Sequence, residues 1–186
     1  MSDDGKALAE GFYWYAEKLM WGYENVAPNP EEAFRFYRQA ADLDFSDAMI
    51  RMGELLEHRK GVAQNAKDAL VQYQKAANAG NFLGWGFIAR LLSRTKHHPK
   101  AEAYWDLFFR SLEERGEPRF LAETVAGVIH MYLEAQLQRG LSPQHVALIR
   151  HHRLALIAHH QNLLEYASER RLDVLKGVAD WMSENL

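Results

Sequence analysis

The stretch SDAMIRMGELLEHRKGVAQNAKDALVQYQKAANAGN, residues 46–81, decides the fold. Ser46 suits the N-cap of a helix that runs to about His58, and the loop RKGVAQ follows it. Asn65 suits the N-cap of a second helix, with Asp68 three residues later at the positive end of the helix dipole. That second helix ends near Gly80, because glycine is the common residue just past a helix C-terminus. The stretch therefore predicts two helices joined by a short loop.

The segment before it repeats this plan at an offset of 36 residues. Asn29 suits the N-cap of a helix, and Pro30 suits its first helical position, where a proline is tolerated. Between residues 26–41 and 62–77, seven of sixteen positions are identical: Val26/Val62, Ala27/Ala63, Asn29/Asn65, Ala33/Ala69, Tyr37/Tyr73, Ala40/Ala76 and Ala41/Ala77. A period in the thirties with two helices per period indicates an α-solenoid of helical hairpins.

The segment after it, residues 82–117, keeps the first helix of the plan and changes the rest. The positions that align with the small and apolar residues of the central stretch are Gly84, Ile88, Ala89 and Leu92. TKHHPK replaces the earlier turn, and bulky Trp105, Phe108 and Phe109 stand in the region where alanines packed before. Such a change is expected where a terminal repeat meets a cap.

The repeat pattern stops after Gly116 and Pro118, so we expect residues 118–186 to form a C-terminal helical cap. One helix is expected to run to about Arg139, and a second helical pattern runs from Pro143 to about Arg171. The final amphipathic stretch is either a continuation of that pattern or a separate helix. The expected organisation is a repeat array over 1–117, with units of about 9–45, 46–81 and 82–117, followed by the cap.

The spacing of small, glycine and aromatic positions resembles the Sel-one-like repeat, a relative of the tetratricopeptide repeat. The positions that carry the resemblance are Ala48, Met52-Gly53, Gly61-Val62, Asn65, Ala69, Tyr73, Ala76-Ala77 and Gly80. It covers about residues 9–116, and the first unit departs from it at Ala16-Glu17, where the family has Leu-Gly. The resemblance implies a right-handed α-solenoid whose concave face binds proteins or peptides, and an adaptor without catalytic activity. We therefore predict an all-α protein of about three helical hairpins with a C-terminal helical cap.

Composition narrows the functional classes. The 186 residues are 48% hydrophobic, which suffices for a continuous core, and contain no cysteine, which excludes disulfides and thiolate chemistry. The net charge is −3; residues 1–60 hold 12 acidic and 7 basic side chains, and no segment is strongly basic. We therefore expect no nucleic-acid partner. The acidic start and the lack of a long apolar run predict no signal peptide or membrane partner, and a cytoplasmic location.

The first helix of each unit is expected to line the concave face. With Gly53, Ala69, Ala76 and Ala77 assigned to close helix packing, the opposite helical faces give the expected partner-binding residues: Trp14, Tyr15, Lys18, Trp21, Ile50, Arg51, Glu54, Phe87 and Arg90. Aromatic residues at helical spacing more often belong to a core, so burial is the favoured reading for Trp14, Trp21 and Phe87. For Arg51 and Arg90 the binding role is favoured.

Five of the nine histidines lie between residues 145 and 160. His160 falls on the expected buried face, and His145, His152 and His159 recur every seven residues beside it. Ligands on one helix need a spacing of three or four residues to reach one ion, so this pattern argues against a metal site within one helix. Structural packing is the favoured reading, although histidines at a helix contact or a pH-sensitive surface remain alternatives.

We expect no catalytic residue, metal or cofactor, because no phosphate loop, nucleophile elbow or His-Glu-x-x-His motif is present. Two competing hypotheses remain. The C-terminal helices would pair with a second copy to make a dimeric scaffold, or a histidine such as His130, His152 or His159 would act in an enzyme pocket at the junction of repeats and cap. The main prediction is a scaffold or adaptor that binds a protein or peptide.

Overall fold

The computed structural model describes residues 3–24, 27–58, 61–115, 122–137, 139–165 and 169–186. Within these ranges the regular elements are ten helices and no strand: α1 (Asp3–Trp21), α2 (Pro30–Asp42), α3 (Ser46–His58), α4 (Ala66–Asn78), α5 (Leu83–Arg94), α6 (His98–Arg115), α7 (Ala122–Gln136), α8 (Pro143–His151), α9 (Arg153–Glu165) and α10 (Glu169–Asn185). The predicted all-α fold is confirmed. No helix in the described ranges combines the length and the apolar character that crossing a bilayer requires.

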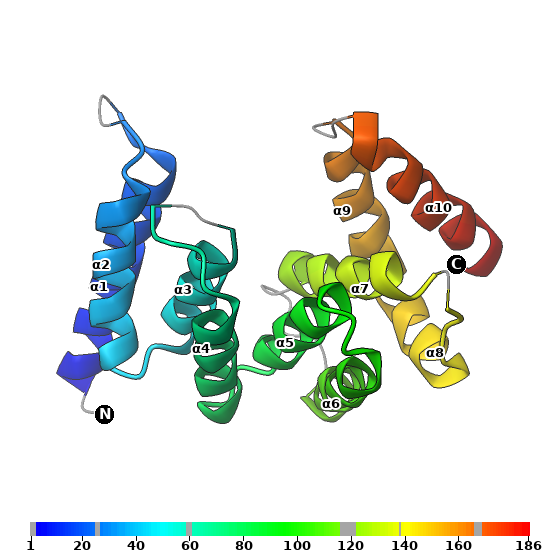
Figure 1. Ribbon diagram of the computed structural model, residues 1–186, viewed down its shortest axis with the longest axis horizontal. Coiled ribbons are helices and arrows are strands. Elements are labelled where there is room, and N and C mark those ends of the chain that lie inside the picture. Colours follow the sequence, from blue (N-terminus) through cyan, green and yellow to red (C-terminus); the bar gives the residue numbers. More distant parts are fainter. Residues whose placement is uncertain (1–2, 25–26, 59–60, 116–121, 138, 166–168) are drawn as a thin grey trace. The chain divides into compact units, whose positions relative to one another are not determined.

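The chain forms two compact units, Met1–Leu91 and Leu92–Leu186, and their boundary falls inside α5. The expected boundary between residues 117 and 118 lies outside the described residues and stays a prediction. In the first unit α1 pairs with α2, and α3 pairs with α4, as the repeat pattern predicted (Figure 1).

Both predicted asparagine caps are confirmed. The Asn29 side chain accepts a hydrogen bond from the backbone N–H of Glu32 at 3.2 Å, and Asn65 accepts one from Asp68 at 3.1 Å. In each case the asparagine amide also donates back to the acid's carboxylate. Because a side-chain cap satisfies a helical N–H that would otherwise lack a partner, these two sites set where the second helix of each hairpin begins.

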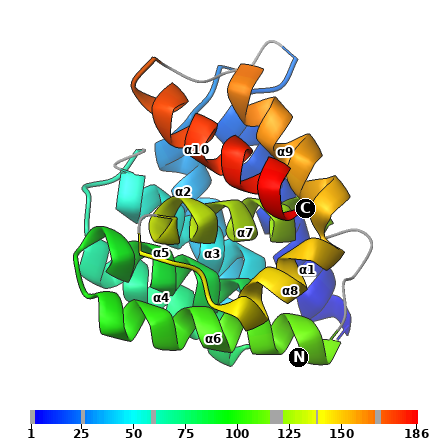
Figure 2. The same ribbon diagram turned by 90° about the vertical axis from the view of Figure 1, so that its right-hand side faces the viewer.

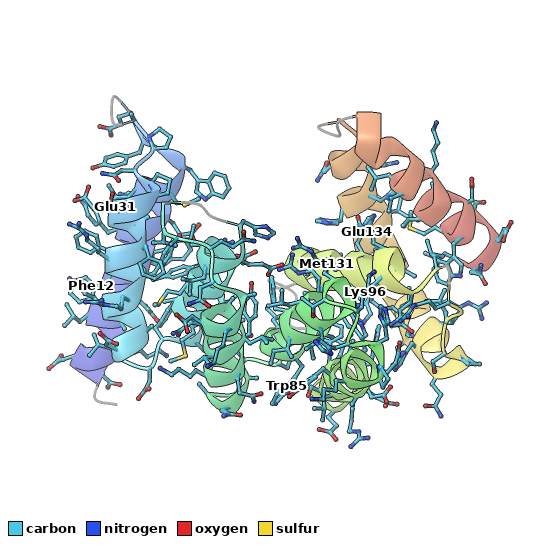
Figure 3. All side chains as sticks on the ribbon, in the orientation of Figure 1. Phe12, Glu31, Trp85, Lys96, Met131 and Glu134 are labelled. Carbon is cyan, nitrogen blue, oxygen red and sulfur yellow. The ribbon has the colours of Figure 1, made fainter. Side chains whose placement is uncertain are left out.

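The core cluster between α1, α2 and α3 combines small, aliphatic and aromatic side chains. Its buried residues come from three helices: Ala16, Leu19, Ala33, Tyr37, Ala40, Ala48, Met52 and Leu55, with Phe12 partly buried against them. Figure 3 labels Phe12 on α1 and Glu31 at the start of α2. Small residues allow the helices to approach, and the aromatic rings fill the remaining volume.

The core of the second unit contains a cluster of aromatic rings. Trp105, Phe108 and Phe109 of α6 are at most 1% exposed, and Tyr132 of α7 packs on them with ring centroids 5.2 Å from Trp105 and 4.9 Å from Phe109. His145 of α8 stacks on Phe109 at 4.2 Å. The bulky residues that break the repeat pattern are therefore the centre of this unit's core.

The expected helix from Pro143 to Arg171 is wrong as one element. The helix breaks at His152, where the backbone has φ −100° and ψ 12°. The backbone N–H of His152 donates a hydrogen bond to the carbonyl of Ile149, three residues earlier instead of four. α10 then begins at Glu169 as a separate helix, which answers the question that the sequence left open. The two helices after the break, α9 and α10, both pack against α7 (Figures 1 and 2). Neither glycine nor proline occurs at the break, where His152 is 8% exposed.

Candidate functional site

A partly buried glutamate joins three helices of the first unit. Oε1 of Glu17, on α1, accepts a hydrogen bond from the Tyr37 hydroxyl of α2 at 2.6 Å and from Arg51 Nε of α3 at 2.8 Å. Burial and the Glu17 carboxylate together raise the pKa of the Tyr37 hydroxyl far above its ordinary value. The hydroxyl therefore stays protonated and donates to the acid, while Arg51 supplies the compensating positive charge.

The same chemistry recurs one hairpin later. Oε2 of Glu57, on α3, accepts from the Tyr73 hydroxyl of α4 at 2.9 Å and from Arg90 Nη2 of α5 at 2.5 Å. The tyrosines are 36 residues apart, whereas Glu17 and Glu57 are 40 apart. The acid has thus moved by one helical turn.

Gly53 explains this shift, because it occupies the column of Glu17 in the second repeat. A Cβ at Gly53 would lie 2.3 Å from Cε1 of Tyr73, so the tyrosine ring rests directly on the glycine backbone. No acid fits there, and the carboxylate comes from Glu57 instead. This contact confirms the predicted role of Gly53 in close packing.

The two clusters differ in their access to solvent. The Arg51 side chain is 38% exposed and that of Glu17 is 16% exposed, whereas Arg90 and Glu57 are 14% and 2% exposed. Beside the first cluster lies a cleft of about 90 Å³ between α1, α2 and α3. Its lining residues are Glu17, Met20, Trp21, Tyr37, Arg51, Glu54, Leu55 and His58.

The structure gathers three of the expected partner-binding residues, Trp21, Arg51 and Glu54, in this cleft. Trp14 and Trp21 are more than 60% exposed, so the favoured expectation that they belong to the core is wrong. Tyr15 is also exposed, and its ring packs edge-on against Phe36.

Three other expected residues have different surroundings. Ile50 and Phe87 are each only 7% exposed and belong to the core, which corrects their assignment as surface contacts. Phe87 stacks on Tyr73 with ring centroids 5.1 Å apart, as the favoured core reading predicted. Arg90 is committed to Glu57, and the Lys18 ammonium lies over the Tyr23 ring at 5.6 Å from its centroid.

The histidines of the second unit are mostly packed inside. His145, His152 and His160 are at most 8% exposed, so they lie packed among the helices, as expected. Sequence spacing along one helix missed their partners on other helices. Tyr132 bonds to Nδ1 of His145 at 2.9 Å, and Asp106 of α6 lies 3.0 Å from its Nε2.

His130 of α7 is the partner of His160. Its Nε2 lies 2.9 Å from Nδ1 of His160, and its Nδ1 lies 3.1 Å from the carboxylate of Glu134, which Figure 3 labels on α7. Burial, reinforced by His130, lowers the pKa of His160. Among the described residues, no group of three or more metal-binding side chains has the geometry to hold an ion.

Glu17 is the functional-site residue that sequence reasoning missed. In the sequence it is marked only by a departure from the Leu-Gly of the repeat pattern. An acid in the column where the repeat pattern has glycine is the available signal, because a largely buried carboxylate requires a partner. Its partner Arg51 lies 34 residues away, which helical spacing within one repeat does not reveal.

Comparisons with known proteins bear on the repeats and on the fold. A family model of the Sel1 repeat matches residues 13–45 and 46–81. A protective antigen present in uropathogenic Escherichia coli strains, which displays an SLR fold, matches 92% of this chain with a TM-score of 0.59 and 14% identity; the match spans 38% of the antigen. A Sel1 repeat protein from Oxalobacter formigenes matches 100% of this chain and 77% of its own, with a TM-score of 0.55 and 18% identity. These structures confirm the solenoid fold.

Proposed function

Because this chain carries two Sel1 repeats, at residues 13–45 and 46–81, we propose that it is a non-enzymatic scaffold that binds a protein or peptide partner. Proteins with Sel1 repeats are in general helical-repeat scaffolds for protein interaction. The proposed binding surface is the cleft between α1 and α3 together with the exposed tryptophans of α1. Solenoid proteins present such surfaces along their stacked helices.

The observation that supports this proposal most is the exposure of Trp21 at the cleft. Its side chain is 64% exposed, and its indole N–H donates to Oε2 of Glu17 at 3.3 Å. Trp14, one heptad earlier on the same helix, is 62% exposed. Tryptophan beside arginine is the composition that most often contributes binding energy at protein interfaces. An extended peptide seated on Trp21 would cover apolar surface that now faces water.

A displayed library of random peptides tests this proposal when it is selected on the full chain. We expect the selected peptides to bind Trp21→Ala at least tenfold more weakly than the parent, since an anchoring aromatic is lost. Val71→Ala is the matched control, because Val71 lies on α4 outside the cleft and is 45% exposed. Peptides that bind Trp21→Ala as tightly as the parent would contradict the proposed surface.

A further inference from the structure

The cleft between α1 and α3 contains more negative than positive charge. Two carboxylates, Glu17 and Glu54, share the single guanidinium of Arg51. In the second cluster one carboxylate, Glu57, faces one guanidinium, Arg90. Among the described residues, the first cluster therefore holds one carboxylate more than it holds guanidinium groups, whereas the second holds equal numbers.

The additional carboxylate is that of Glu54. Its Oε2 accepts from Arg51 Nη1 at 3.0 Å, and no hydrogen bond to its Oε1 occurs among the described residues. Glu17, in contrast, is occupied by Tyr37, Arg51 and Trp21. The Glu54 side chain is 28% exposed and lines the cleft, so its free oxygen is accessible to a donor from outside.

The walls of the cleft suit the rest of a long basic side chain. Met20 and Leu55 supply apolar surface for an alkyl stem, and the exposed ring of Trp21 offers a face over which a cation is attracted. We propose that this cleft receives a lysine or arginine side chain from an extended peptide segment of the partner, with Glu54 as its ion-pair partner. This inference rests on the proposed scaffold function.

An acidic side chain does not fit this cleft. Arg51 is already held by two carboxylates, so an incoming carboxylate would meet Glu17 and Glu54 before it gained a free cation. The second cluster offers no alternative place, since Glu57 and Arg90 are buried against each other. The composition of the surrounding segment favours a basic partner, because residues 1–60 hold 12 acidic and 7 basic side chains.

The peptide selection on the full chain also tests this inference. We expect the peptides that depend on Trp21 to be enriched in lysine or arginine. Replacing that residue by glutamine in the peptide, or Glu54→Gln in the protein, should each weaken binding about tenfold, as the loss of one charged hydrogen bond predicts. Glu31→Gln is the matched control, because Glu31 is an exposed acid on α2 that pairs with Arg35 and lies outside the cleft lining.

The outcomes separate the two proposals. Peptides that depend on Trp21 but lack a basic residue, or that bind Glu54→Gln as tightly as the parent, overturn the inference and leave the scaffold surface intact. Recovery of no peptide that depends on Trp21 overturns both. Loss of binding in Glu54→Gln counts as support only if its circular dichroism and melting temperature match those of Glu31→Gln.

Discussion

Replacing Gly53 by alanine tests the contact that organises the second hairpin. The added Cβ would lie 2.3 Å from Cε1, 2.7 Å from Cδ1 and 2.8 Å from Cζ of the Tyr73 ring. Tyr73 is fully buried, its hydroxyl donates to Glu57, and its ring stacks on Phe87. The ring therefore has no free direction in which to retreat, and its movement would disturb the Glu57–Arg90 pair as well.

The size of the effect follows from two opposing contributions. Overpacking in a filled core costs about 1–3 kcal/mol, whereas alanine gains about 1 kcal/mol over glycine within a helix. The matched control is Gly11→Ala on α1, where an added Cβ meets nothing within 4 Å. Only the propensity gain applies there, so Gly11→Ala should stabilise the protein. The two variants should differ by about 1–3 kcal/mol in free energy of unfolding.

Urea unfolding followed by circular dichroism measures this difference, and both glycines lie in the unit Met1–Leu91. We expect Gly11→Ala to raise the urea concentration at the unfolding midpoint above that of the parent. The midpoint of Gly53→Ala should be lower than that of Gly11→Ala. Combining Gly53→Ala with Tyr73→Leu should abolish the penalty of the alanine, because the clashing ring is gone. Equal stabilisation by both alanines would refute the close packing of Gly53 against the ring.

Three further predictions concern a buried ion pair, a glycine with a positive φ and a buried histidine. Glu57→Ala should destabilise the protein by about 3 kcal/mol in urea unfolding, because it leaves Arg90 buried without its carboxylate; the exposed acid in Glu31→Ala should cost less than about 1 kcal/mol. Gly61→Ala should lower the melting temperature, because Gly61 has φ +74° and an added Cβ would lie 2.5 Å from the backbone N of Glu31; an unchanged melting temperature would contradict this. Folding lowers the pKa of the buried His160. At pH values just below the ordinary pKa of histidine, the unfolded chain therefore binds more protons than the folded chain. Stability should therefore fall as the pH drops below about 6.5, and His160→Leu should flatten that slope; an identical slope would exclude His160 as its source.

The local elements of this protein could be predicted because they depend on neighbouring residues. Asn29 and Asn65 each cap a helix through a hydrogen bond to the residue three positions later, and such a contact is visible in any short window. Tyr73 recurs as Tyr37 one repeat earlier, and Gly53 matches the glycine of the repeat pattern, so their packing could also be predicted. The break at His152 could not, because no helix-breaking residue marks it.

The sequence by itself determined the helical hairpins, their period and the small residues on which the helices pack, since these depend on local propensity and spacing. Only the tertiary structure decided which charges meet. Glu17 reaches Arg51 across 34 residues, and His130 reaches His160 across 30. It also decided that Trp21 is exposed while Ile50 and Phe87 are buried, although all three occupy the helical face expected to line the concave surface. Burial depends on what stacks against a helix, and that information is not contained in the period of the helix itself.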